Sequence, residues 1–442
     1  MVQYRPPQDW EQWGNWLAAG LHGRNRSRLA VIITGIVFAR GRRTVTSWLR
    51  AAGIADGFAN YYYFLRPLGI KSKELADRLY ALLLVRLVKG DRVLLACDDS
   101  PTKRYGPKVQ GAGIHHNPTP GPTDQKFLYG HVWVTISLVL RHPLWHTIGL
   151  PLIGLLYVRA KDLAKIPRKY GWRFQTKLEL AAEQILHFAA IAKSAGIAVW
   201  VAVDGAYAKR RFLRPLRAAG VVIVSRLRKD AALFDLPPKP KTRTRGRPRK
   251  YGRKRIHLKR RAAHRSGWQT IECFVYGKLV KKTIKTFLAT YPPAGGVIRV
   301  VIVKEEDRCE FFFCTDADAT PREMVEAFAD RASIEQDFHD VKEVWGAGQQ
   351  QVRNIWTNVA VFNLNLWVHT LVECWAWSKP ADEIRDRHDS PWDEPERRPS
   401  HADRRKALRR QMLQNEYSAL APSHRRSSKI RALYERLLQL AA

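Results

Sequence analysis

The sequence predicts an α/β protein in which helices flank a mixed β-sheet, with more helices before and after it. Apolar residues make up 45 % of the 442 residues, which is enough for a sizeable core. Short β-branched and aromatic runs begin near residue 92, and a segment of helical periodicity at 176–195 separates them from further runs. Strands, a helix and then strands again are typical of a mixed sheet with helices packed on it.

The charge balance points to a polyanionic partner. The chain has 76 Lys and Arg against 40 Asp and Glu, a formal net charge of +36. We favour nucleic acid over anionic lipid, because the charge spreads over folded-looking segments and no amphipathic lipid-binding helix is evident.

The cysteines and the apolar segments exclude several classes of protein. Five scattered cysteines without a C-x-x-C pair argue against a structural zinc site and a disulfide scaffold, and favour a reducing compartment. The N-terminus has no hydrophobic signal core. The apolar stretch 144–158 is too short to cross a bilayer as a helix, so we interpret it as a buried strand. We therefore expect a cytoplasmic protein without membrane insertion.

The N-terminal part is helical and basic. Within it, residues 43–54 suggest a helix, a glycine turn and a further helix, which fits either a helix-turn-helix-like unit or an ordinary helical cap. The whole chain divides into a helical DNA-binding domain (1–88), the first part of the core (89–230), a basic linker with a β-rich insertion (231–318), the last part of the core (319–377) and a helical tail (378–442).

The linker before the insertion is strongly basic. Nine of the fifteen residues from Lys241 to Arg255 are Lys or Arg. The run Arg245-Gly246-Arg247-Pro248 is similar to the centre of a motif that inserts arginines into a narrow DNA minor groove. A loop that only neutralises phosphates is the alternative. In both cases the expected DNA contacts are Arg245, Arg247, Arg249 and Lys250.

Carboxylates stand at the ends of two predicted strands. Asp98 and Asp99 follow the apolar run 93–97, and Asp204 follows 199–203. A strand end fixes the backbone while the side chain opens to solvent, as a metal ligand requires. A simple turn residue is the alternative for each position.

A third carboxylate lies in the long helix that Pro321 is expected to open. Phe328, Arg331, Glu335 and Lys342 follow the pattern F-x2-R-x3-E-x6-K, and at about 100° per residue they share one stripe about 60° wide. A surface ion pair between Arg331 and Glu335 is the alternative. Three further acids of this helix should be solvated charges: Asp330, Asp337 and Asp340.

These motifs together resemble the DDE transposases of bacterial insertion sequences, in the group marked by Y-x2-R-x3-E-x6-K. The similarity covers about residues 90–370, with Phe328 in place of the signature Tyr. It implies a ribonuclease-H-like core that a β-rich insertion interrupts before the Glu helix. It also implies that Asp99, Asp204 and Glu335 bind two Mg²⁺ ions, or Mn²⁺, during DNA cleavage and strand transfer. Asp99 is preferred over Asp98 because a hydroxyl residue, Ser100, follows it.

The resemblance assigns further roles. Arg331 and Lys342 would hold phosphate oxygens, while Phe328 lacks the hydroxyl by which the family's Tyr contacts DNA. Trp268 is either a stacking platform for a flipped base or a core aromatic. The implied reaction is cut-and-paste transposition on double-stranded transposon ends and target DNA, by a homodimer joined through its C-terminal helices. The alternatives are another ribonuclease-H-fold nuclease or resolvase, and a catalytically silent DNA-binding relative.

Overall fold

The computed structural model describes residues 5–117, 125–238, 249–420, 434 and 437. The N-terminal part consists of five helices, and the wide apolar faces of α2 and α5 bury Leu, Ile and Val side chains in the main core. Their bounds are α1 (Gln8–Ala18), α2 (Gly23–Phe38), α3 (Val45–Ala51), α4 (Ala59–Ile70) and α5 (Ser72–Leu87). In the segment compared with a helix-turn-helix, the Thr44 side chain caps α3 and Gly53 adopts a left-handed φ of 71° after it.

A mixed sheet forms the centre of the molecule. Its core strands are β1 (Arg92–Lys103), β2 (Gly113–His116), β3 (Phe127–His142), β4 (His146–Tyr157), β5 (Ala198–Val203) and β6 (Val222–Arg226). Strand β1 is antiparallel to β3 and parallel to β5, and β6 is parallel to β5. Strands β3 and β4 form the predicted hairpin, and β4 is the buried strand expected at 144–158. This sheet, covered by helices, confirms the predicted fold class.

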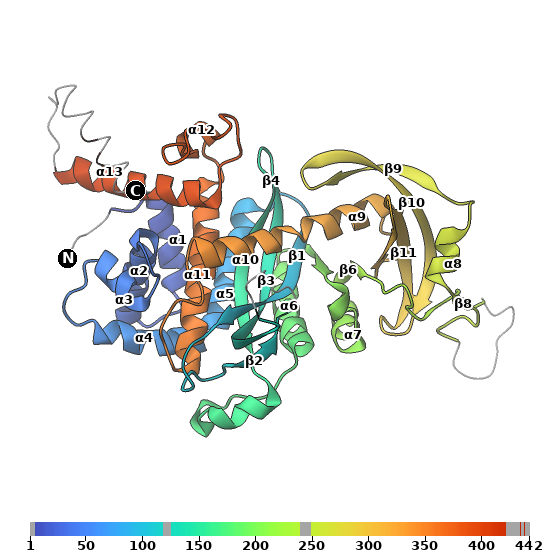
Figure 1. The fold of residues 1–442 in the computed structure, drawn as a ribbon, viewed down its shortest axis with the longest axis horizontal. Coiled ribbons are helices and arrows are strands. Elements are labelled where there is room, and N and C mark those ends of the chain that lie inside the picture. The colour runs from blue at the N-terminus through green and yellow to red at the C-terminus, as the bar shows by residue number, and fades with distance from the viewer. Residues whose placement is uncertain (1–4, 118–124, 239–248, 421–433, 435–436, 438–442) are drawn as a thin grey trace.

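The β-rich insertion continues the same sheet. It consists of β7 (Leu233–Phe234), β8 (Arg255–Ile256), α8 (Leu258–Ala263), β9 (Gln269–Val275), β10 (Lys278–Tyr291), β11 (Gly296–Lys304) and β12 (Cys309–Cys314). Because β12 pairs with β6, twelve strands make one sheet through the described residues. Figure 1 shows the core between the N-terminal helices on one side and the insertion on the other.

The helices of the core lie on both faces of the sheet. After β4 come two short 3₁₀ turns, η1 (Ala160–Lys165) and η2 (Arg168–Tyr170). Helix α6 (Lys177–Ser194) begins with a capping box of Thr176 and Glu179. The turn η3 (Gly205–Tyr207) follows β5 and leads into α7 (Arg210–Ala218).

The helix predicted to begin at Pro321 is two helices, which corrects the sequence analysis. Helix α9 (Pro321–Asp330) starts with Pro321 at its first turn and a Thr320–Glu323 capping box. The chain tightens at Arg331 and Ala332, where the amides of Ala332 and Glu335 bond three residues back instead of four. Helix α10 (Ser333–Glu343) then begins and carries Glu335 and Lys342.

Three more helices follow in the described residues: α11 (Ile355–Ala376), α12 (Ala381–Ile384) and α13 (His401–Leu420). Helix α11 is buried along almost its whole length, and α13 packs Ala407, Leu408 and Met412 into the core beside it. None of the helices in the described part of the chain is long and apolar enough to cross a membrane.

Candidate active site

Two carboxylates, one within β1 and one directly after β5, lie near each other on two internal strands of the core sheet. Asp98 and Asp99 were predicted to end their strand, but β1 continues to Lys103 because its pairing with β3 extends that far. The parallel ladder between β1 and β5 pairs Cys97 with Val203 as its last rung. Asp98 and Asp204 are therefore the next residues on the two strands, and neighbours in a parallel register point to the same face. The charge of Asp204 also reaches Asp98, where it contributes to a raised pKa.

Helix α10 covers this face of β1. Ile334 and Phe338 pack with Ala96, so the even-numbered residues of the strand face the helix. The guanidinium of Arg331 donates to Asp98 (Nη1 to Oδ2, 2.8 Å) and reaches Glu335 (Nη2 to Oε1, 3.4 Å). Further along, the ammonium of Lys342 donates to the hydroxyl of Ser100 at 2.6 Å. The structure thus gathers Asp98, Asp204, Arg331, Glu335 and Lys342 on one side of the sheet.

Asp99 lies on the opposite face of β1. Its carboxylate accepts a hydrogen bond from Lys177 of α6 at 2.6 Å and one from the hydroxyl of Tyr207 at 3.3 Å. The sequence analysis preferred Asp99, but the geometry groups Asp98 with Asp204 and Glu335. The apolar run before Asp98 gave no clue, because both faces of β1 are covered and its buried residues do not alternate with exposed ones.

Burial and neighbouring charges set the electrostatics of the cluster. Burial raises the pKa of Asp98, the Arg331 guanidinium opposes this rise, and the charges of Asp99 and Asp204 add to it. Burial also lowers the pKa of Lys342. Side-chain exposure rises from 11 % for Arg331 to 24 % for Asp98 and 65 % for Glu335, so the cluster opens to solvent on the Glu335 side.

The oxygens of the cluster fit a divalent cation. Crowded carboxylates repel one another, and hard oxygen donors are the ligands that Mg²⁺ and Mn²⁺ prefer. Within the described part of the chain, one group of three potential metal ligands has its ligand atoms within 4.8 Å of one another. This group is Asp340, His369 and His401, and it lies outside the cluster described above. Asp98, Asp204 and Glu335 are spaced more widely than this, with the Arg331 guanidinium joining two of them.

Phe328 supports the cluster from inside the protein. It is only 9 % exposed, and its ring lies 4.8 Å from that of Phe312. The guanidinium carbons of Arg226 and Arg331 both lie 5.3 Å from the ring centre. A side chain in this place orients Arg331 through a cation–π contact and is not at the surface where DNA would lie.

The other predicted DNA contacts belong to the insertion. Trp268 is half-buried against the core, and the ammonium of Lys285 sits 4.5 Å from the centre of its ring. Arg249 and Lys250 are exposed. Arg245 and Arg247 lie outside the described residues, and with them the whole Arg245–Pro248 motif.

Three aspartates predicted to be solvated are buried, which corrects the sequence analysis. Asp330, Asp337 and Asp340 are less than a tenth exposed. Strand β4 and helix α11 cover the side of α10 that carries Asp337 and Asp340, and Arg141 of β3 and Thr147 of β4 contact Asp330 at the end of α9. Thr147 donates to Asp330 and Ser137 to Asp337, each at 2.7 Å. Gly149 leaves the space for Asp337, since a Cβ there would lie 2.3 Å from a carboxylate oxygen.

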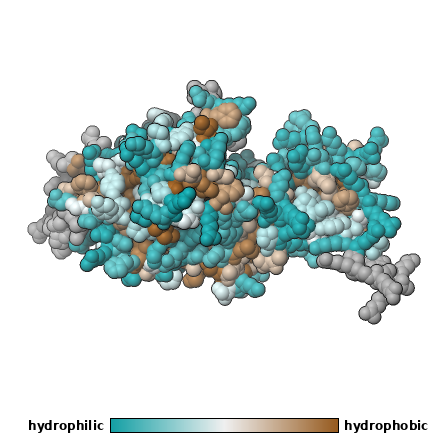
Figure 2. Space-filling view, turned by 90° about the horizontal axis from the view of Figure 1, so that it is seen from below, coloured by the Kyte–Doolittle hydropathy of each residue, from teal (hydrophilic) through white to brown (hydrophobic). Residues whose placement is uncertain are grey.

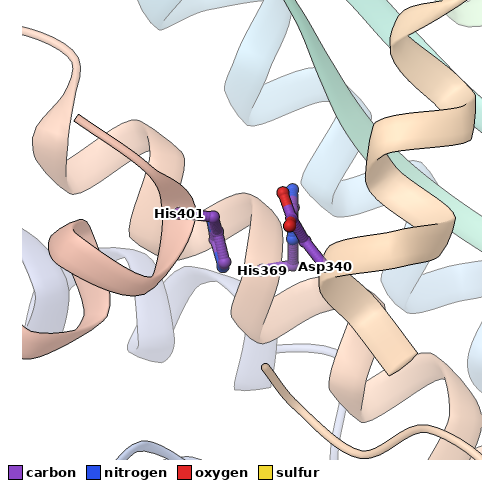
Figure 3. A group of neighbouring side chains, drawn as sticks. All are labelled: Asp340, His369 and His401. Carbon is purple, nitrogen blue, oxygen red and sulfur yellow. The ribbon is translucent and has the colours of Figure 1, made fainter. Parts of the chain in front are cut away.

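Asp340 belongs to the compact set of ligating side chains, with His369 of α11 and His401 of α13 (Figure 3). Both ring nitrogens of His401 are engaged: Trp345 donates to Nε2 at 2.7 Å, and Nδ1 lies 2.5 Å from Glu373. The two imidazoles stack with centroids 3.8 Å apart and planes 16° apart. Because a metal binds in the plane of an imidazole ring, two stacked rings do not direct lone pairs to one point. This arrangement therefore favours a hydrogen-bonded clamp between three helices over a metal centre.

Comparison with known proteins agrees with this geometry. A model of the DDE superfamily endonuclease family matches residues 17–281, more than half of the chain. The chain therefore belongs to the DDE superfamily endonucleases, a class of DNA-cleaving enzymes for which a divalent metal ion is the typical cofactor. No curated protein matches the chain at a significant level. The family match spans Asp98 and Asp204 but ends before Glu335.

Proposed function

We propose that this endonuclease is a transposase that cleaves DNA at transposon ends and joins those ends to a target. The observation that carries the proposal is that Asp98 and Asp204 directly follow the last rung of the ladder between β1 and β5, and that Arg331 contacts both Asp98 and Glu335 of helix α10. Two such aspartates on neighbouring strands and a helical Glu are the residues that the resemblance to insertion-sequence transposases requires.

In this proposal Asp98, Asp204 and Glu335 hold two divalent ions, Mg²⁺ or Mn²⁺. When bound, such ions lower the pKa of an attacking water and stabilise the leaving oxygen of a phosphodiester. The chain itself contributes the carboxylate oxygens of Asp98 and Asp204 on the core sheet. It also contributes an opening to solvent at Glu335 and the nearby cations Arg331 and Lys342. These cations would orient phosphate oxygens.

We infer that the chain belongs to the Y-x2-R-x3-E-x6-K group with one substitution. The support is that Arg331 contacts Asp98 of β1, Lys342 contacts Ser100 of the same strand, and Glu335 contacts Arg331, although the turn between α9 and α10 is tightened. Phe328 retains the ring that holds Arg331 but lacks a hydroxyl. Another donor would therefore contact the phosphate that the family's Tyr contacts.

The insertion would hold the DNA end. The face of the insertion seen in Figure 2 is largely hydrophilic, and the segment between β7 and β8 carries the exposed Arg249 and Lys250. Lys285 lies against the Trp268 ring and the ring is half-buried against the core, so a flipped base would stack only on the part of the ring that stays exposed. Two ends must meet for transposition, so we also propose a homodimer. The described part of α13 packs on α2 and α11 of its own chain.

The test uses a labelled DNA fragment that carries the sequences flanking this reading frame, with Mg²⁺ or Mn²⁺. Asp98→Asn and Asp204→Asn should abolish strand cleavage, while Asp99→Asn, the matched neighbour on the other face of β1, should retain part of it. DNA binding should survive in all three variants. Cleavage by Asp98→Asn at the wild-type rate would refute the assignment. Cleavage without joining would indicate a nuclease or resolvase, and binding without cleavage a silent relative.

A further inference from the structure

Asp99, Tyr207 and Lys177 form a second polar group directly behind the candidate active site. Tyr207 closes the η3 turn that begins after Asp204, and its hydroxyl lies 3.3 Å from Asp99 Oδ1. Lys177, the first residue of α6, donates to Asp99 Oδ2 at 2.6 Å. Asp99 therefore joins β1, the turn after β5 and α6 at a single carboxylate.

The Asp204 turn needs such an anchor. The backbone ladder between β1 and β5 ends at Cys97 and Val203, one residue before the two candidate ligands. Beyond it, Asp204 accepts a hydrogen bond from the amide of Ala206, which shapes the turn but does not attach it to β1. Tyr207 supplies the attachment: its ring is 2 % exposed and packs edge-on against Phe212, and its hydroxyl reaches across to Asp99. A buried hydroxyl that loses its partner carries a desolvation cost, so this bond is favoured over an open turn.

Lys177 accounts for the charge of Asp99. An unpaired carboxylate beside Asp98 would increase the repulsion among the acidic groups of the site. Lys177 pairs with Asp99 where the two side chains are 36 % and 26 % exposed, and its ammonium also lies 5.7 Å from the centre of the Tyr157 ring. The Asp99 carboxylate can therefore serve as a structural acceptor without adding a free charge.

We propose that Asp99, Tyr207 and Lys177 are positioning residues that fix the Asp204 turn against β1, so that Asp204 and Asp98 present their oxygens to the same cation. The inference rests on the proposed function only for the identity of the ligands. It assigns Asp99 a role outside the metal site and gives a function to the aromatic residue three positions after Asp204.

Mn²⁺ binding to the purified full chain, measured by the loss of the free-ion electron paramagnetic resonance signal, tests this inference without DNA. Asp98→Asn should abolish binding. Tyr207→Phe, which keeps the ring and removes the hydroxyl, should weaken binding about tenfold, and Asp99→Asn and Lys177→Met should weaken it to a similar degree. Tyr80→Phe is the matched control, because it removes a buried hydroxyl for which the described residues offer no partner.

The same variants should cleave DNA with a higher half-saturating Mn²⁺ concentration and recover at high Mn²⁺. Complete loss of Mn²⁺ binding in Asp99→Asn would overturn the inference, since Asp99 would then be a ligand. Tyr207→Phe with a lower melting temperature but unchanged Mn²⁺ affinity would overturn it as well. A wild-type chain that binds Mn²⁺ but does not cleave DNA would contradict the proposed function alone.

Discussion

Two clusters of acidic residues share helix α10 and differ in how their charges are balanced. On one side of the helix, Glu335 lies near Asp98 of β1 and Asp204 after β5. The Arg331 guanidinium contacts both Asp98 and Glu335. On the other side, Asp340 approaches His369 and His401 beneath α13, where Glu373 is paired with Arg404 at 2.9 Å. Glu335 is 65 % exposed, whereas Glu373 is 2 % exposed.

The two clusters differ in what neutralises their carboxylates. Asp98, Asp204 and Glu335 form a cluster that is open to solvent, whereas the chain itself supplies the groups that pair with Glu373. Next to β1 and β5, the Arg331 guanidinium contacts two of the three carboxylates and the cluster opens to solvent at Glu335, which leaves negative charge for an incoming cation. Between the helices, Glu373 accepts from both His401 and Arg404, so its buried charge is paired within the chain. Glu373 Oε2, His369 Nδ1 and two Arg404 nitrogens stay without a hydrogen-bond partner among the described residues. Compactness alone would have selected the second cluster as the metal site. We propose the first cluster as the metal site instead, on the grounds of charge balance and lone-pair direction.

Glu335→Gln should have the largest effect and should act on catalysis alone. Loss of a residue that only hydrogen-bonds to a metal ligand reduces activity by up to roughly 100-fold. Because Glu335 is proposed to bind the metal itself, its replacement should reduce strand cleavage by more than this. Because Glu335 is exposed, the free energy of unfolding should change by no more than about 0.5 kcal/mol. Cleavage assays and denaturant melts on one preparation measure both quantities. Cleavage by this variant at the wild-type rate would contradict the proposal that Asp98, Asp204 and Glu335 form the active site.

Glu373→Gln should show the reverse behaviour. It leaves the buried Arg404 guanidinium without its charged partner, which should destabilise the fold by about 3–5 kcal/mol. The matched control is Glu183→Gln, which removes an exposed ion pair with Lys73 and should change stability by less than about 1 kcal/mol. Urea melts compare the two variants. Equal stabilities would mean that the helical cluster is not a clamp.

Local sequence patterns were sufficient for the sheet, for the insertion and for the position of Asp204 directly after β5, but they ended the first core strand at Asp98 and Asp99, whereas β1 continues to Lys103. A run such as Val199–Val203 is apolar because it is buried, and a carboxylate directly after it is readable without knowing any partner. The sequence did not predict toward which face of the sheet each acidic side chain points. Asp98 and Asp99 are distinguished only by their register with β5 and by helices more than seventy residues away.

The helix after Pro321 shows the same limit. Neither glycine nor proline marks the break at Arg331 and Ala332, whose backbones both keep right-handed helical angles. A helical wheel places Asp337 away from Glu335 but does not say what covers that side. Ser137, Gly149 and His369 cover it, and they lie on β3, β4 and α11. Long-range packing therefore converted an expected solvated face into a buried polar one.

The stability of the fold should fall as the pH drops below about 6.5, because buried histidines stay neutral. His131 accepts from Arg104 at Nδ1 and lies 3.0 Å from the Gln110 carbonyl at Nε2, and burial lowers its pKa to about 3. The unfolded chain binds a proton below pH 6.5 and the folded chain does not, so this stability is lost progressively toward pH 3. The loss should be about 2 kcal/mol between pH 6.5 and 5. His131→Gln should show a shallower dependence in urea melts across this range, and an unchanged slope would contradict the assignment.

Removal of divalent metal should have the smallest effect on stability while it abolishes cleavage. Chelation would withdraw any ion from the cluster of Asp98, Asp204 and Glu335, which is open to solvent at Glu335, and we expect such an ion to add little to the free energy of folding. The cluster of Asp340, His369 and His401 is held by Trp345 and Glu373 without an ion, so the melting temperature of the dialysed protein should stay within about 2 °C of the untreated one. Differential scanning calorimetry with and without chelator measures this. A fall in the melting temperature of many degrees, restored by zinc but not by magnesium, would show that the cluster of Asp340, His369 and His401 holds a structural metal. The distinction drawn here between the two clusters would then be wrong.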